Sequence, residues 1–158
     1  LRDFGYCIAP FNAYMTAIGL ETLSLRMDRQ CENAMKLAKA LSTHPKVLSL
    51  NYPGLIYNPY HNIAKKQFKH RYGAILTLTL KDKQQAFNFI DKLKLAKNTT
   101  NIGDSRTLVI HPASTIFLEF SEAERLKNGV KDGLVRVSVG IEDAHDIIND
   151  FKQALEAI

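Results

Sequence analysis

The sequence predicts an α+β fold, built as a two-layer α/β sandwich in one domain. Three observations lead to this fold class: a long stretch of helical period near the N-terminus, four short segments patterned as strands with helical segments between them, and a final stretch of helical period. Strands that alternate with helices form a sheet covered by helices, because each apolar helix face needs an apolar sheet face to bury it.

The first long stretch runs from Asn12 to about Ser42. Apolar residues recur there every three to five positions, with charged residues between them. These apolar residues are Ile18, Leu23, Met27, Cys31, Ala34, Ala38 and Leu41. The spacing predicts one long amphipathic helix, which ends before His44-Pro45 because a proline disfavours helical geometry in the residue before it.

Next, residues 47–50 (Val-Leu-Ser-Leu) are patterned as a strand, which the turn residues 52–55 (Tyr-Pro-Gly-Leu) close. Residues 59–69 are polar with a few apolar residues on one side, which predicts a short surface helix. Residues 74–80 alternate between two faces, one of them strongly apolar, and so predict a second strand.

Residues 84–93 place Phe87, Ile90 and Leu93 at helical spacing, and residues 107–110 predict a third strand. A short helix follows over 121–129, because Ser121 and Glu124 have the spacing of a capping box.

Residues 134–139 are patterned as the fourth strand, and residues 143–158 as a C-terminal amphipathic helix. Acidic residues lie in the first turn of that helix, where the helix dipole favours them. The four strands and their helices complete the predicted sandwich.

Composition excludes several classes of protein. The chain has 158 residues, 46% of them hydrophobic and 23% charged, which is average for a folded domain. No apolar run approaches the roughly 18 residues that span a bilayer, so the pattern is not that of a membrane protein. The two cysteines, Cys7 and Cys31, lack the spacing of a metal site or the density of a disulfide scaffold, which favours a reducing, cytoplasmic setting. The start, Leu1-Arg2-Asp3, resembles neither a natural N-terminus nor a targeting segment, so we expect a piece of a longer chain.

The net charge of +5 suits an anionic partner without requiring a polyanion. Residues 65–72 interleave aromatic and basic side chains, as nucleic-acid patches do, but the same pattern is typical of the solvated end of a short helix, and we favour the solvated helix. The five histidines lack metal-ligand spacing, and phosphate loops and nucleophile elbows are absent. We therefore expect no metal, nucleic acid or membrane partner.

Arg136 is the most informative single residue. Val135, Val137 and Val139 point to one face of the fourth strand, so Arg136 lies on the other face, within an otherwise apolar run. Two interpretations remain open from the spacing. The side chain extends to water from an open sheet face, or its planar fork binds a carboxylate or phosphate.

Two loops flank the third strand. Residues 101–105 (Asn-Ile-Gly-Asp-Ser) and 111–115 (His-Pro-Ala-Ser-Thr) are small and polar, as turns are, and loops at strand ends are also where ligands commonly meet a scaffold. Both interpretations remain open from the residues alone.

Four ordered motifs resemble the C-terminal domain of the Cys/Met-metabolism family of pyridoxal-phosphate enzymes. They cover nearly the whole chain. The motifs are residues 10–13 (Pro-Phe-Asn-Ala) with 19–27 (Gly-Leu-Glu-Thr-Leu-Ser-Leu-Arg-Met), 51–55 (Asn-Tyr-Pro-Gly-Leu), 101–104 (Asn-Ile-Gly-Asp) with 108–115 (Leu-Val-Ile-His-Pro-Ala-Ser-Thr), and 134–143 (Leu-Val-Arg-Val-Ser-Val-Gly-Ile-Glu-Asp).

The resemblance implies an antiparallel-rich sheet of about four strands, with helices on one face, and pyridoxal 5'-phosphate as the cofactor. Variants such as Asn101, which stands where related enzymes carry serine, are most similar to O-acetylhomoserine sulfhydrylases. Those enzymes join an activated homoserine to sulfide or methanethiol, giving homocysteine or methionine plus acetate. Arg136 then takes the role of clamp on the substrate carboxylate, Asn101 helps to position that carboxylate, and Ser114, Thr115 and Ile116 lie behind them.

The chain departs from the family pattern in two ways. Thr115 is followed by Ile116-Phe117 where the family carries a hydroxyl and an imidazole. The lysine that binds the cofactor lies in a Ser/Thr-Lys motif upstream of this domain in the family, and no lysine here has that setting. We therefore expect residues 1–158 to be a substrate-binding domain that is inactive alone and completes its site with its own N-terminal domain and neighbouring subunits, as a homotetramer.

Two alternatives to this function stay open. Within the same family, cystathionine γ-synthase or methionine γ-lyase activity would use the same carboxylate clamp. A non-catalytic amino-acid-binding module would use Arg136 as a receptor for the carboxylate. The resemblance does not distinguish acetyl from succinyl as the leaving group.

Overall fold

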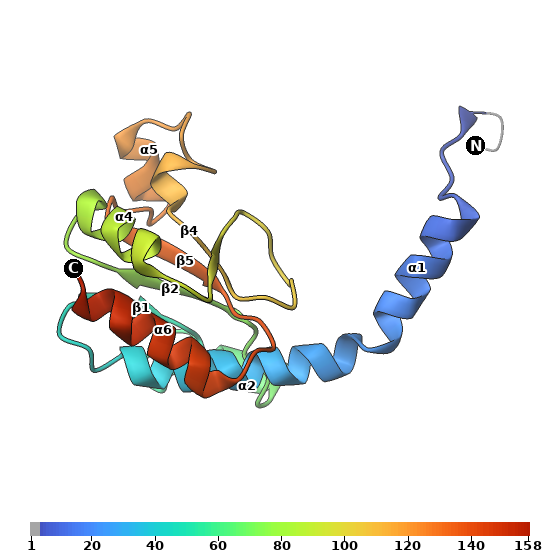
Figure 1. Ribbon diagram of the computed structural model, residues 1–158, viewed down its shortest axis with the longest axis horizontal. Coiled ribbons are helices and arrows are strands. Elements are labelled where there is room, and N and C mark those ends of the chain that lie inside the picture. The colour runs from blue at the N-terminus through green and yellow to red at the C-terminus, as the bar shows by residue number, and fades with distance from the viewer. Residues whose placement is uncertain (1–3) are drawn as a thin grey trace.

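A computed structural model describes residues 4–158 as a five-stranded mixed sheet with helices packed on one face (Figure 1). The strands are β1 (Ser49–Asn51), β2 (Ile75–Thr79), β3 (Lys97–Asn98), β4 (Leu108–Ile110) and β5 (Leu134–Ser138), in the order β1-β2-β5-β4-β3. Each neighbouring pair is antiparallel except β3 and β4. The predicted α+β sandwich with an antiparallel-rich sheet is confirmed; the expectation for Leu1 to Asp3 lies outside the described residues.

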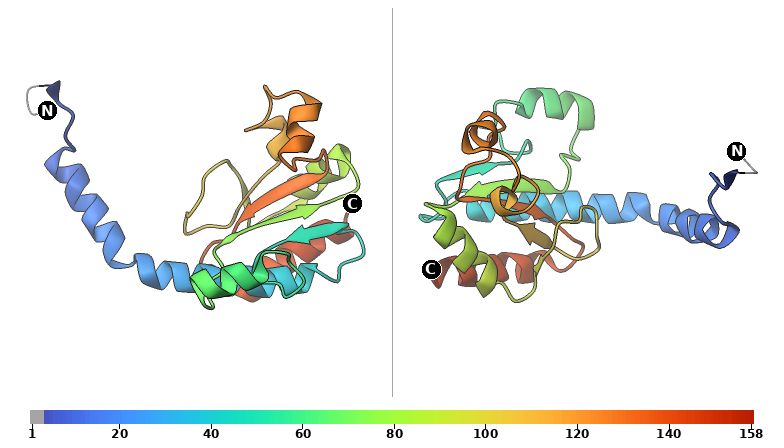
Figure 2. Two further views of the ribbon diagram at one scale, coloured as in Figure 1. Left: turned by 180° about the vertical axis from the view of Figure 1, so that it is seen from behind. Right: turned by 90° about the horizontal axis from the view of Figure 1, so that it is seen from above.

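Three helices cover one face of this sheet and form the core with it: α2 (Leu23–Leu41), α4 (Lys83–Lys92) and α6 (Ala144–Glu156). Figure 2 shows α2 and α6 side by side on that face. The sheet contributes alternate residues of its two central strands, Leu76 and Leu78 from β2 and Val135 and Val137 from β5. Each such apolar side chain stabilises the fold by roughly 1.5–3 kcal/mol when it is fully buried.

The sheet has one strand more than the sequence predicts. The additional strand, β3, is two exposed polar residues that pair in parallel with β4 at Lys97 with Leu108 and Asn98 with Val109. A segment this short has no alternating pattern, so its pairing depends on the chain around it. Its consequence for the site is that a loop, residues 99–106 followed by Thr107, connects β3 to β4.

The predicted single helix from Asn12 to Ser42 is wrong, because the structure has two helices, α1 (Pro10–Glu21) and α2, that meet at an angle at Thr22 (Figure 1). Arg26 stabilises the break. Its guanidinium donates to the Gly19 carbonyl at 3.0 and 3.1 Å and to the Thr22 hydroxyl at 2.8 Å. Carbonyls at the end of a helix lack partners within the helix, so this arginine supplies one for α1.

Two shorter helices, α3 (His61–Phe68) and α5 (Glu122–Lys127), agree with the sequence in kind and differ at their ends. A 3-10 turn, η2 (Pro112–Ser114), follows β4. The capping box predicted at Ser121 is present: the Ser121 hydroxyl accepts from the Glu124 amide at 3.4 Å, and the Glu124 carboxylate accepts from the Ser121 amide at 2.8 Å. Only η2 was not predicted as a helical turn, since it is three residues long.

A buried carboxylate joins α6 to the segment that leads into β3. Asp150 is 7% exposed, and its two oxygens accept hydrogen bonds from three consecutive backbone amides, those of Lys94, Leu95 and Ala96, at 2.8, 3.0 and 3.0 Å. Backbone amides away from water need a partner, and helical geometry ends before this segment. Asp150 therefore determines the path of the chain from α4 toward the loop that follows β3.

Candidate carboxylate-binding site

Arg136 lies at the centre of β5, between Thr77 of β2 and Ile110 of β4. Its side chain is on the sheet face opposite the core valines, as alternation predicts, and it is partly exposed. Burial lowers the pKa of the Arg136 guanidinium from its ordinary value, but an arginine still carries its charge at neutral pH. The sheet therefore presents a cation from its most central position.

Backbone carbonyls of the loop 99–106 hold this guanidinium. Nη2 of Arg136 donates to the carbonyl oxygens of Thr100 at 3.0 Å and Asn101 at 3.4 Å. The Nε of Arg136 is buried and has no hydrogen-bond partner among the described residues 4–158. A guanidinium that is held at Nη2 still has donors at Nε and Nη1, and such donors form charge-assisted hydrogen bonds with the oxygens of an anion.

Asn101 is brought next to Arg136, but through its backbone carbonyl, while its side chain is exposed. The structure therefore places the two predicted binding residues together. Their roles toward a substrate stay predictions.

The loop 99–106 exposes nearly all its side chains, so hydrogen bonds from outside determine its shape. Gln30 of α2 donates to the Asp104 carbonyl at 2.8 Å, the Gly103 amide donates to the Ser138 hydroxyl at 3.2 Å, and the Ile141 amide donates to the Ser105 carbonyl at 2.8 Å. These bonds tie the loop to α2, to β5 and to the segment between β5 and α6.

A salt bridge stabilises the turn inside this loop. The carboxylate of Asp104 accepts from the Arg106 guanidinium at 3.2 Å and from the Arg106 amide at 2.9 Å. These bonds hold the pKa of Asp104 well below its usual value, at about 2. The carboxylate is therefore charged over the whole neutral range, and the pair weakens only as the pH falls through about 2.

The end of the loop is joined to the start of α6 by a second carboxylate. Glu142 accepts from the Thr107 amide at 2.5 Å and from the Thr107 hydroxyl at 2.8 Å, and that hydroxyl accepts from the Gly140 amide at 3.0 Å. Asn33 of α2 donates to the carbonyls of Gly140 and Glu142 at 3.1 and 2.8 Å.

Sequence reasoning missed Gln30 and Asn33. A signal was present, because they lie four residues before Ala34 and Leu37, on the buried stripe of the helix. A polar residue on an apolar stripe needs a polar partner across the interface.

We expect Gly140→Ala to destabilise the protein by about 1–3 kcal/mol, because the added methyl group has no room. A Cβ at Gly140 would overlap the Ser105 carbonyl oxygen and would lie 2.5 Å from the Arg106 carbonyl carbon, both of them backbone atoms. Urea unfolding measures the loss, and Gly19→Ala is the control, since a Cβ there meets no atom within 4 Å. A Gly140→Ala protein as stable as the parent would show that the loop moves freely.

The other predicted residues, Ser114, Thr115 and Ile116, form no hydrogen bond with Arg136. Ser114 and Thr115 close the turn after β4 instead. Ser114 Oγ lies 2.8 Å from Nδ1 of the buried His111, whose Nε2 donates to the Asp132 carbonyl at 2.6 Å. The Thr115 hydroxyl donates to the His111 carbonyl at 2.8 Å. Ile116 is 46% exposed, so its role behind Arg136 and Asn101 is not supported by a contact within this chain.

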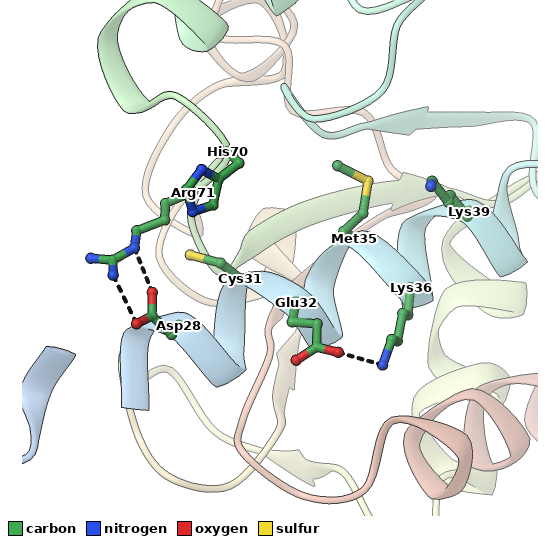
Figure 3. A pocket seen from close by; sticks show the side chains of 8 residues that line it. All are labelled: Asp28, Cys31, Glu32, Met35, Lys36, Lys39, His70 and Arg71. Carbon is green, nitrogen blue, oxygen red and sulfur yellow. Dashed lines mark hydrogen bonds and ion pairs between the residues drawn. The ribbon is translucent and has the colours of Figure 1, made fainter. Parts of the chain in front are cut away.

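A hollow of about 500 Å³ lies between α2 and the segment after α3, and Arg136 is not among its lining residues. Figure 3 shows the side chains that line it. Two ion pairs occupy its rim: Arg71 with Asp28 at 2.5 and 2.8 Å, and Lys36 with Glu32 at 2.6 Å. Arg71, which belongs to the basic residues 65–72, therefore forms its ion pair within this chain, with Asp28. The lysines of that cluster are exposed, in agreement with a solvated helix end.

The lysines of the described chain do not fit a covalent cofactor attachment. Each lysine among residues 4–158 is exposed, except the partly buried Lys46. The Lys46 ammonium donates to carbonyls at the end of α6, those of Leu155 at 2.9 Å and Glu156 at 3.2 Å. Residues 4–158 also contain no cluster of three metal-ligating side chains, and none of their helices has the length and apolarity to cross a bilayer.

The structure is an α+β sheet that presents the Arg136 guanidinium, held at Nη2 by two loop carbonyls and unpaired at Nε among residues 4–158. The family model for Cys/Met metabolism PLP-dependent enzymes matches residues 1–156, and the chain belongs to this family.

The chain is 46% identical to O-acetyl-L-homoserine sulfhydrylase 1 of Thermus thermophilus and 48% identical to homocysteine synthase of Schizosaccharomyces pombe, over 98% and 99% of its length. Its structure superposes with a TM-score of 0.93 on a solved structure described as an O-acetylhomoserine (thiol)-lyase of Campylobacter jejuni, which contains N'-pyridoxyl-lysine-5'-monophosphate. The two are 42% identical over 98% of this chain. The chain spans 37% of the length of each of these three proteins.

Proposed function

We propose that this chain is the C-terminal substrate-binding domain of a PLP-dependent sulfhydrylase. The full-length protein would make homocysteine or methionine from O-acetylhomoserine and sulfide or methanethiol, with release of acetate. The family supports the cofactor class, and the names of the sulfhydrylase and homocysteine synthase relatives support the reaction.

The observation that carries this proposal is the hydrogen bonding of the Arg136 guanidinium. Nη2 is held by two loop carbonyls, while the buried Nε lacks a partner within residues 4–158. The α-carboxylate of an amino-acid substrate supplies two oxygens at the spacing of the guanidinium edge, and such charge-assisted pairs contribute roughly 1.5–3 kcal/mol. Arg136 thus binds and orients the substrate and takes no part in proton transfer.

The cofactor is held elsewhere in the protein. Since the lysines described above are exposed or already bonded, residues outside this chain would attach pyridoxal 5'-phosphate. The residues of this chain contribute orientation: the clamp at Arg136 determines how the substrate amino acid faces the rest of the site.

Neighbouring parts of the protein would cover α1. This helix contains no buried residue, and its apolar side chains Phe11, Tyr14 and Ile18 are 71%, 61% and 41% exposed. An apolar surface of this kind is typical of an interface. We propose that the protein's own N-terminal domain and adjacent subunits of a cytoplasmic homotetramer form that interface.

A substrate panel tests the reaction. The full-length protein is assayed with O-acetylhomoserine, O-succinylhomoserine and methionine, each with sulfide, methanethiol or cysteine. We expect the highest kcat/KM with O-acetylhomoserine and sulfide or methanethiol. Faster formation of cystathionine, or faster breakdown of methionine, would assign one of the two related activities instead. Binding of amino acids without turnover would indicate a non-catalytic module.

A further inference from the structure

The side chain of Gln30 lies in the interior of the protein, on the face of α2 that points toward the loop 99–106. It is 1% exposed, and its Nε2 donates to the Asp104 carbonyl at 2.8 Å. A primary amide buried away from water costs free energy unless it is hydrogen-bonded, so this contact constrains both partners. The two residues are 74 positions apart in the sequence, and the bond therefore joins separate parts of the fold.

The loop that Gln30 holds is the one that supports Arg136. Three residues before Asp104, the carbonyl of Asn101 accepts from Nη2 of Arg136, as does that of Thr100. Between these points the chain turns at Gly103, whose φ of 76° is in the left-handed region. Side chains 99–106 pack little against the core, so a lost tether would not be replaced by apolar contacts.

We propose that Gln30 is a positioning residue for the carboxylate clamp: by fixing the Asp104 carbonyl it fixes the carbonyls that orient the Arg136 guanidinium. This inference rests on the proposed function, because it assigns a role to Gln30 through Arg136. Gln30 does not contact the substrate carboxylate in this arrangement. Gln30 restricts the motion of the loop, so that the guanidinium nitrogens not bonded to the loop are presented in one orientation.

The test replaces Gln30 by methionine in the full-length protein, which keeps the volume of the side chain and removes its donor. The matched control is Tyr52→Phe. Tyr52 is also buried, and its hydroxyl lies 3.0 Å from the carbonyl oxygen of Gly73 and 3.4 Å from that of Cys31, to both of which it donates. Cys31 follows Gln30 directly in α2. Both variants lose buried hydrogen bonds near the same turn of α2, but only Gln30→Met releases the loop.

We expect Gln30→Met to raise KM for O-acetylhomoserine roughly two- to twelvefold, the equivalent of one hydrogen bond, with kcat within twofold of the parent. Amide hydrogen exchange over residues 99–106 becomes faster in this variant. Tyr52→Phe lowers the melting temperature but leaves KM and exchange in the loop unchanged. If Gln30→Met does not fold, Gln30→Leu is measured in its place with the same expectation, and failure of both to fold would assign Gln30 a purely structural role.

Two results would overturn the inference, and Arg136→Ala measured in parallel separates them. If Arg136→Ala raises KM while Gln30→Met lowers only the melting temperature, Gln30 is structural and the proposed clamp stands. If Arg136→Ala itself leaves KM unchanged, the proposed clamp fails, and the role of Gln30 fails with it.

Discussion

Replacing Arg136 by alanine in the full-length protein is expected to raise KM for O-acetylhomoserine about ten- to a hundredfold. The substitution removes the guanidinium that would donate hydrogen bonds to the substrate carboxylate at the centre of the sheet. No other guanidinium among residues 4–158 is held by the loop carbonyls of Thr100 and Asn101. Cofactor binding should persist, since the described lysines do not fit its attachment, and the absorbance of the bound cofactor measures this directly.

Two further variants make the result specific. Arg136→Lys keeps the charge but loses the planar fork, so we expect a KM between those of the parent and Arg136→Ala. Arg71→Ala removes a guanidinium paired with Asp28, and its KM should stay within about twofold of the parent, because exposed ion pairs contribute little. A clamp role for Arg136 would be refuted by unchanged substrate kinetics in Arg136→Ala, or by an equal effect of Arg71→Ala.

Asp150→Ala is expected to lower the free energy of unfolding by about 3–5 kcal/mol, the largest effect on stability that we predict. The substitution leaves the amides of Lys94, Leu95 and Ala96 without their acceptor, and each unsatisfied buried group costs about 1–3 kcal/mol. Water can reach part of this segment, so the three losses do not add in full. Urea unfolding followed by circular dichroism measures the difference.

Two variants on α6 serve as comparisons. Asp150→Asn retains one carbonyl oxygen as acceptor and should lose less stability than Asp150→Ala. Asp146→Ala removes an exposed carboxylate from the first turn, which contributes only about 0.3–1 kcal/mol through the helix dipole. A loss below about 1 kcal/mol for Asp150→Ala would mean that the segment 94–96 finds other partners.

Local patterns predicted most of the fold correctly. Period-two alternation identified β2 and β5 and placed Arg136 opposite Val135 and Val137, because the geometry of a strand alone determines which residues share a face. The capping box identified the start of α5, since its hydrogen bonds lie within four residues. Where the determining contacts are local, the residues involved are visible in the sequence.

The break at Thr22 was missed because the apolar spacing continues through it, although the Arg26 bonds that stabilise it are local. The other missed features depend on the surrounding fold: the two-residue strand β3 exists only because β4 lies beside it. Motifs at 101–104 and 134–143 indicated that Asn101 and Arg136 belong to one site. They did not indicate that the contact uses the Asn101 backbone, since that depends on how the loop folds over β5.

The sequence by itself determined the α+β class, the face that Arg136 occupies and the resemblance to pyridoxal-phosphate enzymes. These follow from periodicity and motifs, which are properties of neighbouring residues. Only the tertiary structure decided how the guanidinium is held, because Gln30, Ser138 and Glu142 reach the loop 99–106 and Thr107 at its end from positions 35 to 74 residues away. Hydrogen bonds over such separations form when packing of the core brings their elements together, and no local pattern specifies them.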